Sequence, residues 1–150
     1  MIREPRGADI ATVMALSLDM KEESPVFRDS SYVADKHFAW LRGLQENENQ
    51  FFVVDEVDGE IAGFFVGGIS SYFFNYEQFA EDYTVYVSPK FRSTGVAVRL
   101  IKAFERWAEE RGAIRTYLGT NVGIRSERFV KFLKALGYGG EGAILYKDLS

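Results

Sequence analysis

The residues best suited to chemistry form one stretch, in which a strand pattern meets the start of a long helix. Residues 85–87 read Val-Tyr-Val, which favours a strand, and Pro89 ends it because proline brings no backbone donor. From Arg92 the chain carries the pattern R-x-x-G-x-A, whose glycine removes a Cβ where a backbone must come close to something. A helix N-terminus presents four unpaired N–H groups and a partial positive charge. The stretch therefore predicts an anion site, and a phosphate suits it best.

The flanking sequence must supply the strand and the helix that hold this loop. After the loop, apolar residues recur at helical spacing: Leu100, Ile101, Phe104, Trp107 and Ala108. Before it, the period becomes strand-like from Gln50, and Asp58-Gly59 is a two-residue hairpin signal. The return strand contains Gly63, Gly67 and Gly68, which predict a bulge or the close approach of another backbone.

The whole chain predicts an α/β (α+β) domain over residues 1–150, with a mixed, mostly antiparallel central sheet flanked by helices. The expected order is β-α-α-β-β-β-α-β-α-β. The expected elements are an edge strand within 1–6, helices over 9–22 and 31–46, strands over 50–57, 60–69 and 79–88, a helix ending near 111, a strand over 113–120, a helix over 125–136 and a terminal strand over 142–148.

Composition excludes several classes of function. The net charge of −4 argues against a nucleic-acid-binding surface, which is normally basic. The absence of cysteine excludes disulfides, thiolate metal sites and a cysteine nucleophile. The one histidine, His37, leaves too little for a histidine metal site or a Ser-His-Asp triad, so no metal is expected. No signal region or membrane-spanning run is present, which favours a cytoplasmic protein that does not bind membranes.

This order of elements, with R-x-x-G-x-A between the middle strand and the longest helix, resembles the GNAT superfamily of acyl-CoA N-acyltransferases. The resemblance covers essentially the whole chain and rests on residues 85–89, the motif at 92–97, and the ending Phe-Leu-Lys-Ala-Leu-Gly-Tyr at 132–138. A dinucleotide-binding loop would need three glycines and a carboxylate ending a second strand about 20 residues on, where a helix is predicted here. A nucleotide-hydrolysing phosphate loop needs G-K-S or G-K-T, which is missing.

The resemblance implies that acetyl-CoA is the co-substrate. N–H groups from Arg92 to Ala97 would hold its pyrophosphate, and Arg92 could add charge. Backbone groups of Val85 and Val87 would pair with the pantetheine arm, and a backbone N–H there would stabilise the oxyanion. Ser126 stands where many members have a cofactor-contacting asparagine. The residues expected to contact acetyl-CoA are Val85, Tyr86, Val87, Arg92, Ser93, Thr94, Gly95, Val96, Ala97 and Ser126.

A base must deprotonate the incoming ammonium, because only the neutral amine is a nucleophile. Some family members carry a glutamate base at a place comparable to Glu81. With period-two alternation and no bulge, Glu81 shares a face with Val85 and Val87, whereas Asp82 faces the other way. Glu81 is therefore the expected base and Asp82 the alternative.

The family's usual acid is missing from the last helix. Many members have a tyrosine there that protonates the leaving thiolate, but the matching residue is Leu133, which cannot donate a proton. Substitutes are Tyr117, Tyr138, Tyr146 or water.

These features predict an N-acetyltransferase acting on a primary amine of a small molecule or peptide. Leu133 favours an alternative, a GNAT-fold protein that binds acyl-CoA or a partner with little or no turnover. A third interpretation is an interaction domain without a CoA site. The acceptor pocket is expected between residues 22–32 and 72–78, and the acidic first loop would suit a cationic amine. The aromatic turn at 72–76 is either tucked onto the core, or a pocket wall or subunit contact of a homodimer.

Overall fold

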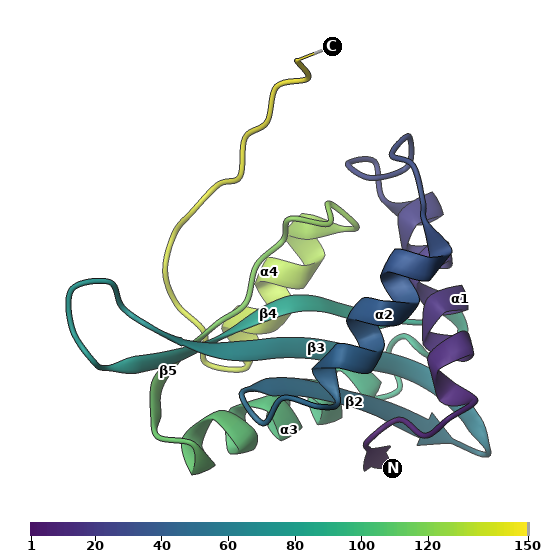
Figure 1. Ribbon diagram of the computed structural model, residues 1–150. Coiled ribbons are helices and arrows are strands. Elements are labelled where there is room, and N and C mark those ends of the chain that lie inside the picture. The colour runs from purple at the N-terminus through teal and green to yellow at the C-terminus, as the bar shows by residue number, and fades with distance from the viewer. Residues whose placement is uncertain (150) are drawn as a thin grey trace.

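A five-stranded sheet forms the centre of the computed structural model, which describes residues 1–149 (Figure 1). Its strands are β1 (Ile2–Arg3), β2 (Gln50–Val57), β3 (Glu60–Ser71), β4 (Gln78–Val87) and β5 (Ala113–Tyr117). They lie in the order β1-β2-β3-β4-β5, and every pair is antiparallel except β4 with β5, which is parallel. The predicted mixed, mostly antiparallel sheet is confirmed.

Helices cover both faces of this sheet (Figure 1). α1 (Asp9–Glu23) and α2 (Ala34–Leu44) pack on one face, and α3 (Val96–Glu110) and α4 (Ser126–Ala135) pack on the other. Successive residues of a strand point to opposite faces, so Phe64 of β3 is buried with α1 and α2, whereas Phe65 is buried against α3. Two apolar cores therefore share one sheet.

Local backbone geometry accounts for one element boundary that was predicted correctly and for two that differ from the prediction. The β2–β3 hairpin turns at Asp58 and Gly59, whose φ angles of 51° and 79° are the positive values that a two-residue turn requires. α2 begins at Ala34 rather than near residue 31, because Val33 still has an extended backbone. β5 ends at Tyr117 rather than at residue 120, and the chain then turns away from β4.

The predicted terminal strand over 142–148 is wrong. Residues 139–149 contain no strand or helix and extend away from the sheet (Figure 1). The prediction came from the apolar, β-branched and aromatic character of this segment, but such a segment forms a strand only where a neighbouring strand pairs with it.

The glycines of β3 allow β4 to approach closely, as predicted. A β-bulge lies at Val66/Gly67, and a Cβ added at Gly67 would lie 2.6 Å from the carbonyl oxygen of Glu81 and 2.9 Å from the ring of Phe104. The nearest atoms are backbone and buried ring atoms, which cannot move aside cheaply.

We therefore expect Gly67→Ala to lower the free energy of unfolding by about 2 kcal/mol. Gly43→Ala in α2 is the matched control: a Cβ there meets nothing within 4 Å, and we expect a gain of about 0.5 kcal/mol or more. Urea unfolding of both variants measures the difference. Equal stabilities would show that the β3–β4 approach is not tight.

Candidate active site

The edge of β4 that faces β5 is open over half of its length. Pairing between the two strands ends at Glu81 and Tyr117, and within residues 1–149 no strand pairs with 82–87 on this side. The N–H of Ser88 donates to Ala62 of β3, so by alternation the N–H and C=O groups of Val85 and Val87 point toward the open side. β4 and β5 therefore separate after Glu81 and Tyr117.

A cavity of about 300 Å³ occupies this opening. Its walls come from β4, the loop before α3, the first turn of α3, the loop at 119–125 and one side of α4. Seven of the ten residues expected to contact acetyl-CoA line it: Val85, Tyr86, Val87, Arg92, Ser93, Gly95 and Ala97.

The loop that precedes α3 has the backbone geometry of an anion site. Ser93 and Gly95 have φ angles of 66° and 88°, and Gly95 is the N-cap of α3. The N–H of Arg99 donates to the carbonyl of Gly95 at 3.0 Å, so the N–H groups of the residues between them belong to the unpaired first turn. Ser93, Gly95, Ala97 and Val98 all line the cavity, which places the positive end of the helix at its wall.

Three of the ten expected residues do not line the cavity with their side chains. The hydroxyl of Thr94 donates to the carbonyl of Phe91 and so braces the loop. Val96 is buried in the core beneath α3, because the first turn of the helix points this position toward the sheet. Ser126 is the first residue of α4 and is not among the residues that line the cavity. At Thr94 and Val96 only the backbone is left to contact an anion.

Arg92 lines the cavity, but other groups hold its guanidinium. Its Nη2 donates to Oε1 of Glu23 at 2.8 Å, and its Nε donates to the carbonyl of Val87 at 3.0 Å. The hydroxyl of Tyr86 also donates to Glu23, at 3.2 Å. Arg92 lowers the pKa of the Glu23 carboxyl, which keeps the pair ionised. The network fixes α1 to β4, and it occupies the Val87 carbonyl that was expected to pair with pantetheine.

Arg125 and Arg128 are cations of this site that the sequence analysis missed. Both line the cavity beside the start of α4. Neither takes part in a salt bridge in the part of the chain that the structure describes. Their spacing of three places them on one side of a helix start, and this basic pair was the available signal.

A bulge in β4 reverses the sheet faces that were predicted for its two carboxylates. Val66 pairs with Thr84 and Gly67 with Asp82, so Tyr83 is the extra residue and shifts the alternation. The prediction that Glu81 shares a face with Val85 and Val87 is therefore wrong. Asp82 shares that face and lines the cavity, whereas Glu81 lies on the α2 side of the sheet and does not line it.

The environment of Asp82 favours proton exchange near neutral pH. Burial raises the pKa of its carboxyl to about 6, and the charge of Glu81 adds to this effect. A backbone hydrogen bond from Gly119 acts in the opposite direction. A carboxylate with such a pKa can accept a proton and release it again at working pH.

Among residues 1–149, no tyrosine offers a free hydroxyl to the cavity. Tyr86 is the tyrosine among the lining residues, but it donates to Glu23, and burial raises its pKa to about 12. Tyr138 donates to Glu105 at 3.0 Å, Tyr117 is hydrogen-bonded to Tyr72 at 2.9 Å, and neither lines the cavity. Tyr146 lies in the extended terminal segment.

Leu133 is buried in the core shared with α3. A leucine side chain has no acidic proton, so this position cannot protonate a leaving thiolate, as the sequence indicated.

His37 lies apart from the cavity. Its ring accepts or donates one hydrogen bond with Tyr32 at 2.8 Å and stacks on Trp40, and burial lowers its pKa. It does not line the cavity. No group of three or more metal-ligating side chains forms among residues 1–149.

The two segments expected around the acceptor differ in position. The hydroxyl of Ser24 donates to the carbonyl of Val122, so the loop after α1 packs beside the cavity wall. The aromatic turn instead projects from the sheet, with Phe73 and Tyr76 each 98% exposed. It is neither tucked onto the core nor part of this cavity wall.

The chain is similar in sequence to known proteins. A model of the Acetyltransferase (GNAT) family matches residues 13–138. An uncharacterized N-acetyltransferase of Methanocaldococcus jannaschii is 33% identical over 104 residues, which are 68% of this chain and 43% of that relative. The chain thus spans less than half the length of this curated relative.

Two solved structures share the fold. AAC(6')-Iy in complex with the bisubstrate analog CoA-S-monomethyl-acetylneamine aligns with a TM-score of 0.79 and 21% identity, over 100% of this chain and 98% of that chain. An aminoglycoside acetyltransferase, meta-AAC0020 from an uncultured soil metagenomic sample in complex with sisomicin, aligns with a TM-score of 0.73 and 15% identity, over 100% of this chain and 96% of that chain.

No helix within residues 1–149 is long and apolar enough to cross a membrane.

Proposed function

Since the chain belongs to the GNAT family of acetyltransferases, whose members use acetyl-CoA as the acetyl donor, we propose that it transfers this acetyl group to a primary amine of a small molecule or peptide. One observation carries the proposal. A single cavity joins the N-terminal end of α3 to the open edge of β4, and Asp82 lines the same cavity.

The two ends of the cavity suit the two ends of the donor. The N–H groups after Gly95 would bind the pyrophosphate, and Arg125 and Arg128 would add positive charge beside it. The free backbone groups of Val85 and the N–H of Val87 would pair with the amides of the pantetheine arm. Arg92 would act mainly by fixing the β4 end of the site through Glu23.

Asp82 rather than Glu81 would serve as the base in the transfer step. The neutral amine attacks the thioester carbonyl carbon, a C–N bond forms and the C–S bond breaks. The proton lost by the ammonium passes to the carboxylate of Asp82, directly or through a water molecule. A backbone N–H on the open edge of β4 would donate to the oxyanion. The nitrogen that has joined the acetyl group loses its second proton to water, and the departing CoA thiolate takes a proton from water, since no tyrosine among residues 1–149 offers a free hydroxyl to the cavity.

A cationic acceptor would match the charge near the site. Of the acidic residues at the end of α1 and in the loop after it, Glu23 is paired with Arg92, whereas Glu22 and Asp29 are exposed. Structures of similar fold were solved with CoA-S-monomethyl-acetylneamine and with sisomicin. Aminoglycosides, polyamines and peptides with a free amine are therefore the acceptors to test first.

Leu133 and the engaged Tyr86 favour a second function, acyl-CoA binding with little or no turnover. Thiol release from acetyl-CoA, measured with a panel of amines, separates the two. We expect release that depends on one class of amine, with an acetylated product of matching mass. Saturable acetyl-CoA binding with no release on any amine would contradict the transferase proposal and support the binding protein.

A further inference from the structure

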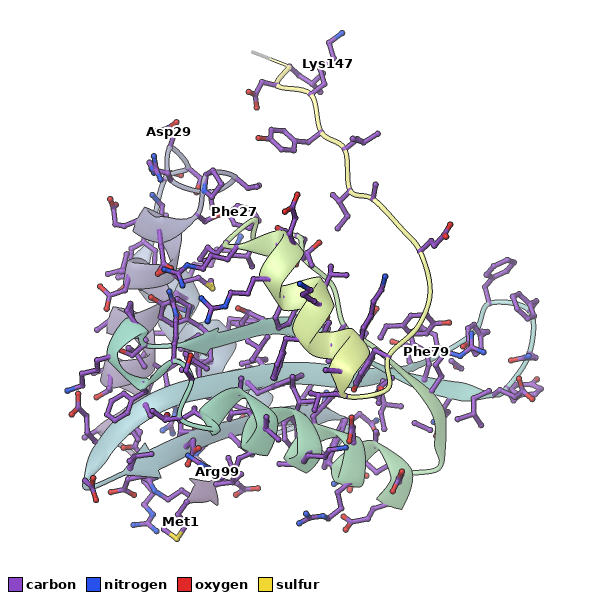
Figure 2. The ribbon with its side chains drawn as sticks, turned by 180° about the vertical axis from the view of Figure 1, so that it is seen from behind. Met1, Phe27, Asp29, Phe79, Arg99 and Lys147 are labelled. Atoms are coloured by element: carbon purple, nitrogen blue, oxygen red, sulfur yellow. The ribbon has the colours of Figure 1, made fainter. Side chains whose placement is uncertain are left out.

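The end of α1 contacts both walls of the cavity, although its residues are not among those that line it. Pairing between β4 and β5 stops at Glu81 and Tyr117, so beyond this point the sheet does not fix how far the loop at 119–125 stands from β4. Figure 2 shows the loop after α1, which carries the labelled Phe27 and Asp29, beside the start of α4. Contacts outside the sheet therefore determine the separation of the two walls.

Two side chains of the last turn of α1 are bonded to the first wall. Thr84 donates to the sulfur of Met20 at 3.3 Å. Glu23 accepts from Arg92 at 2.8 Å and from Tyr86 at 3.2 Å. Thr84, Tyr86 and Arg92 all line the cavity. The last turn of α1 is thus fixed to the wall that β4 and the loop before α3 form.

The next residue along the chain, Ser24, is bonded to the opposite wall. Its side chain is fully buried, and its hydroxyl donates to the carbonyl of Val122 in the loop at 119–125. The same hydroxyl accepts the N–H groups of Val26 and Phe27, both at 3.2 Å. A serine hydroxyl has one donor and two acceptor positions, so all of them are used. Ser24 therefore ties the second wall and the loop after α1 to the end of α1.

The packing around Gly123 belongs to the same contact. Its φ angle is 76°, and a Cβ added there would lie 2.9 Å from Cγ2 of Val26 and 3.4 Å from Cγ of Pro25. Ile124, the next residue, packs against the core that contains α1. Three consecutive residues that line the cavity, 122–124, therefore rest on α1 and on the loop that follows it.

We propose that Ser24 is a positioning residue of the donor site, which together with Glu23 holds the two cavity walls at the separation that acetyl-CoA requires. The two residues are adjacent in the chain, so one wall cannot shift against the other without breaking one of their bonds. This rests on the proposed function only in placing acetyl-CoA in this cavity. Because Ser24 also holds the N–H groups of Val26 and Phe27, acetyl-CoA between the walls restrains the loop at 25–31 as well.

Ser24→Ala removes the bond to Val122, so the affinity for acetyl-CoA should fall roughly 10-fold. Ser17→Ala is the matched control, because Ser17 donates within the same helix, to the carbonyl of Val13 at 2.8 Å, and its loss should leave the affinity unchanged. Titration calorimetry measures both affinities, and thermal unfolding shows that both variants are folded. With the best amine, KM for acetyl-CoA should rise by the same factor in Ser24→Ala while kcat changes by less than about twofold.

Equal affinities in the two serine variants would overturn the role of Ser24 and leave the proposed function standing. A wild type that binds no acetyl-CoA would contradict the proposed function and this role with it.

Hydrogen exchange of the wild type tests the same connection without a variant. Acetyl-CoA should slow amide exchange in residues 119–125 and also in residues 25–31, which are not among the lining residues. The aromatic turn at 72–76 is the control segment, whose exchange should not change. In Ser24→Ala the slowing over 25–31 should be lost. Slowing confined to 119–125 in the wild type would show that the loop after α1 moves independently of the wall, and would overturn the proposal.

Discussion

Gly95→Glu should abolish acetyl-CoA binding. The new carboxylate would stand at the N-cap of α3, beside the N–H groups that the proposal assigns to the pyrophosphate. Placing like charges together costs several kcal/mol, which corresponds to a loss of affinity on the order of 100-fold or more. Titration calorimetry with acetyl-CoA measures the loss directly.

Gly112→Glu is the matched control because it creates the same residue at the other end of the same helix. Gly112 also has a positive φ, 78° against 88° for Gly95, so both variants carry a comparable backbone strain of about 1 kcal/mol. A Cβ at Gly112 meets nothing within 4 Å. Both variants should therefore be slightly less stable, but only Gly95→Glu should lose the cofactor. Unchanged affinity in Gly95→Glu would remove this loop as the phosphate site.

Asp82→Asn should lower kcat by roughly 100-fold or more, with little change in acetyl-CoA affinity, because general-base catalysis contributes on the order of 10² to 10⁴. The amide keeps the shape of the side chain but cannot accept the ammonium proton. Steady-state kinetics with the best amine measures kcat, and calorimetry measures the affinity.

The pH dependence of the rate identifies the same group. Burial raises the pKa of Asp82 to about 6, and only its ionised form can act as a base, so kcat/KM of the wild type should fall as the pH drops through about 6. This limb should be absent in Asp82→Asn. The stability should change in the opposite sense: the raised pKa means that ionising Asp82 destabilises the fold as the pH rises from below 4 toward 6. At pH 8 the asparagine variant should therefore be at least as stable as the wild type.

Glu81→Gln is the paired variant on the adjacent residue. Glu81 lies on the other face of β4, so we expect Glu81→Gln to change kcat only slightly. A large loss in Glu81→Gln together with normal turnover in Asp82→Asn would return the assignment to Glu81.

Local sequence patterns predicted the strand, the loop and the helix start that form one wall of the cavity. The strand, the loop and the start of α3 follow from short-range chemistry: a proline, a glycine with positive φ and an apolar stripe of helical period. These features reproduce the cavity wall at Val85, Ser93 and Gly95, because every one of them is determined by residues a few positions apart.

The features that sequence could not predict depend on distant partners. No side-chain pattern marks the bulge at Tyr83, which arises from register against β3 and decides whether Glu81 or Asp82 faces the cavity. Arg92 is diverted by Glu23, a residue 69 positions earlier that only the docking of α1 brings near. The terminal segment was predicted as a strand from its residue types, but such residues form a strand only where a neighbouring strand pairs with them.

A crystal structure of the full chain with acetyl-CoA tests the central claim most directly. We predict that the pyrophosphate accepts hydrogen bonds from the N–H groups following Gly95, and that the pantetheine arm runs along the open edge of β4 at Val85. The thioester should then lie on the same side of the sheet as Asp82. A pyrophosphate bound elsewhere, or a thioester on the Glu81 side of β4, would contradict the proposed site.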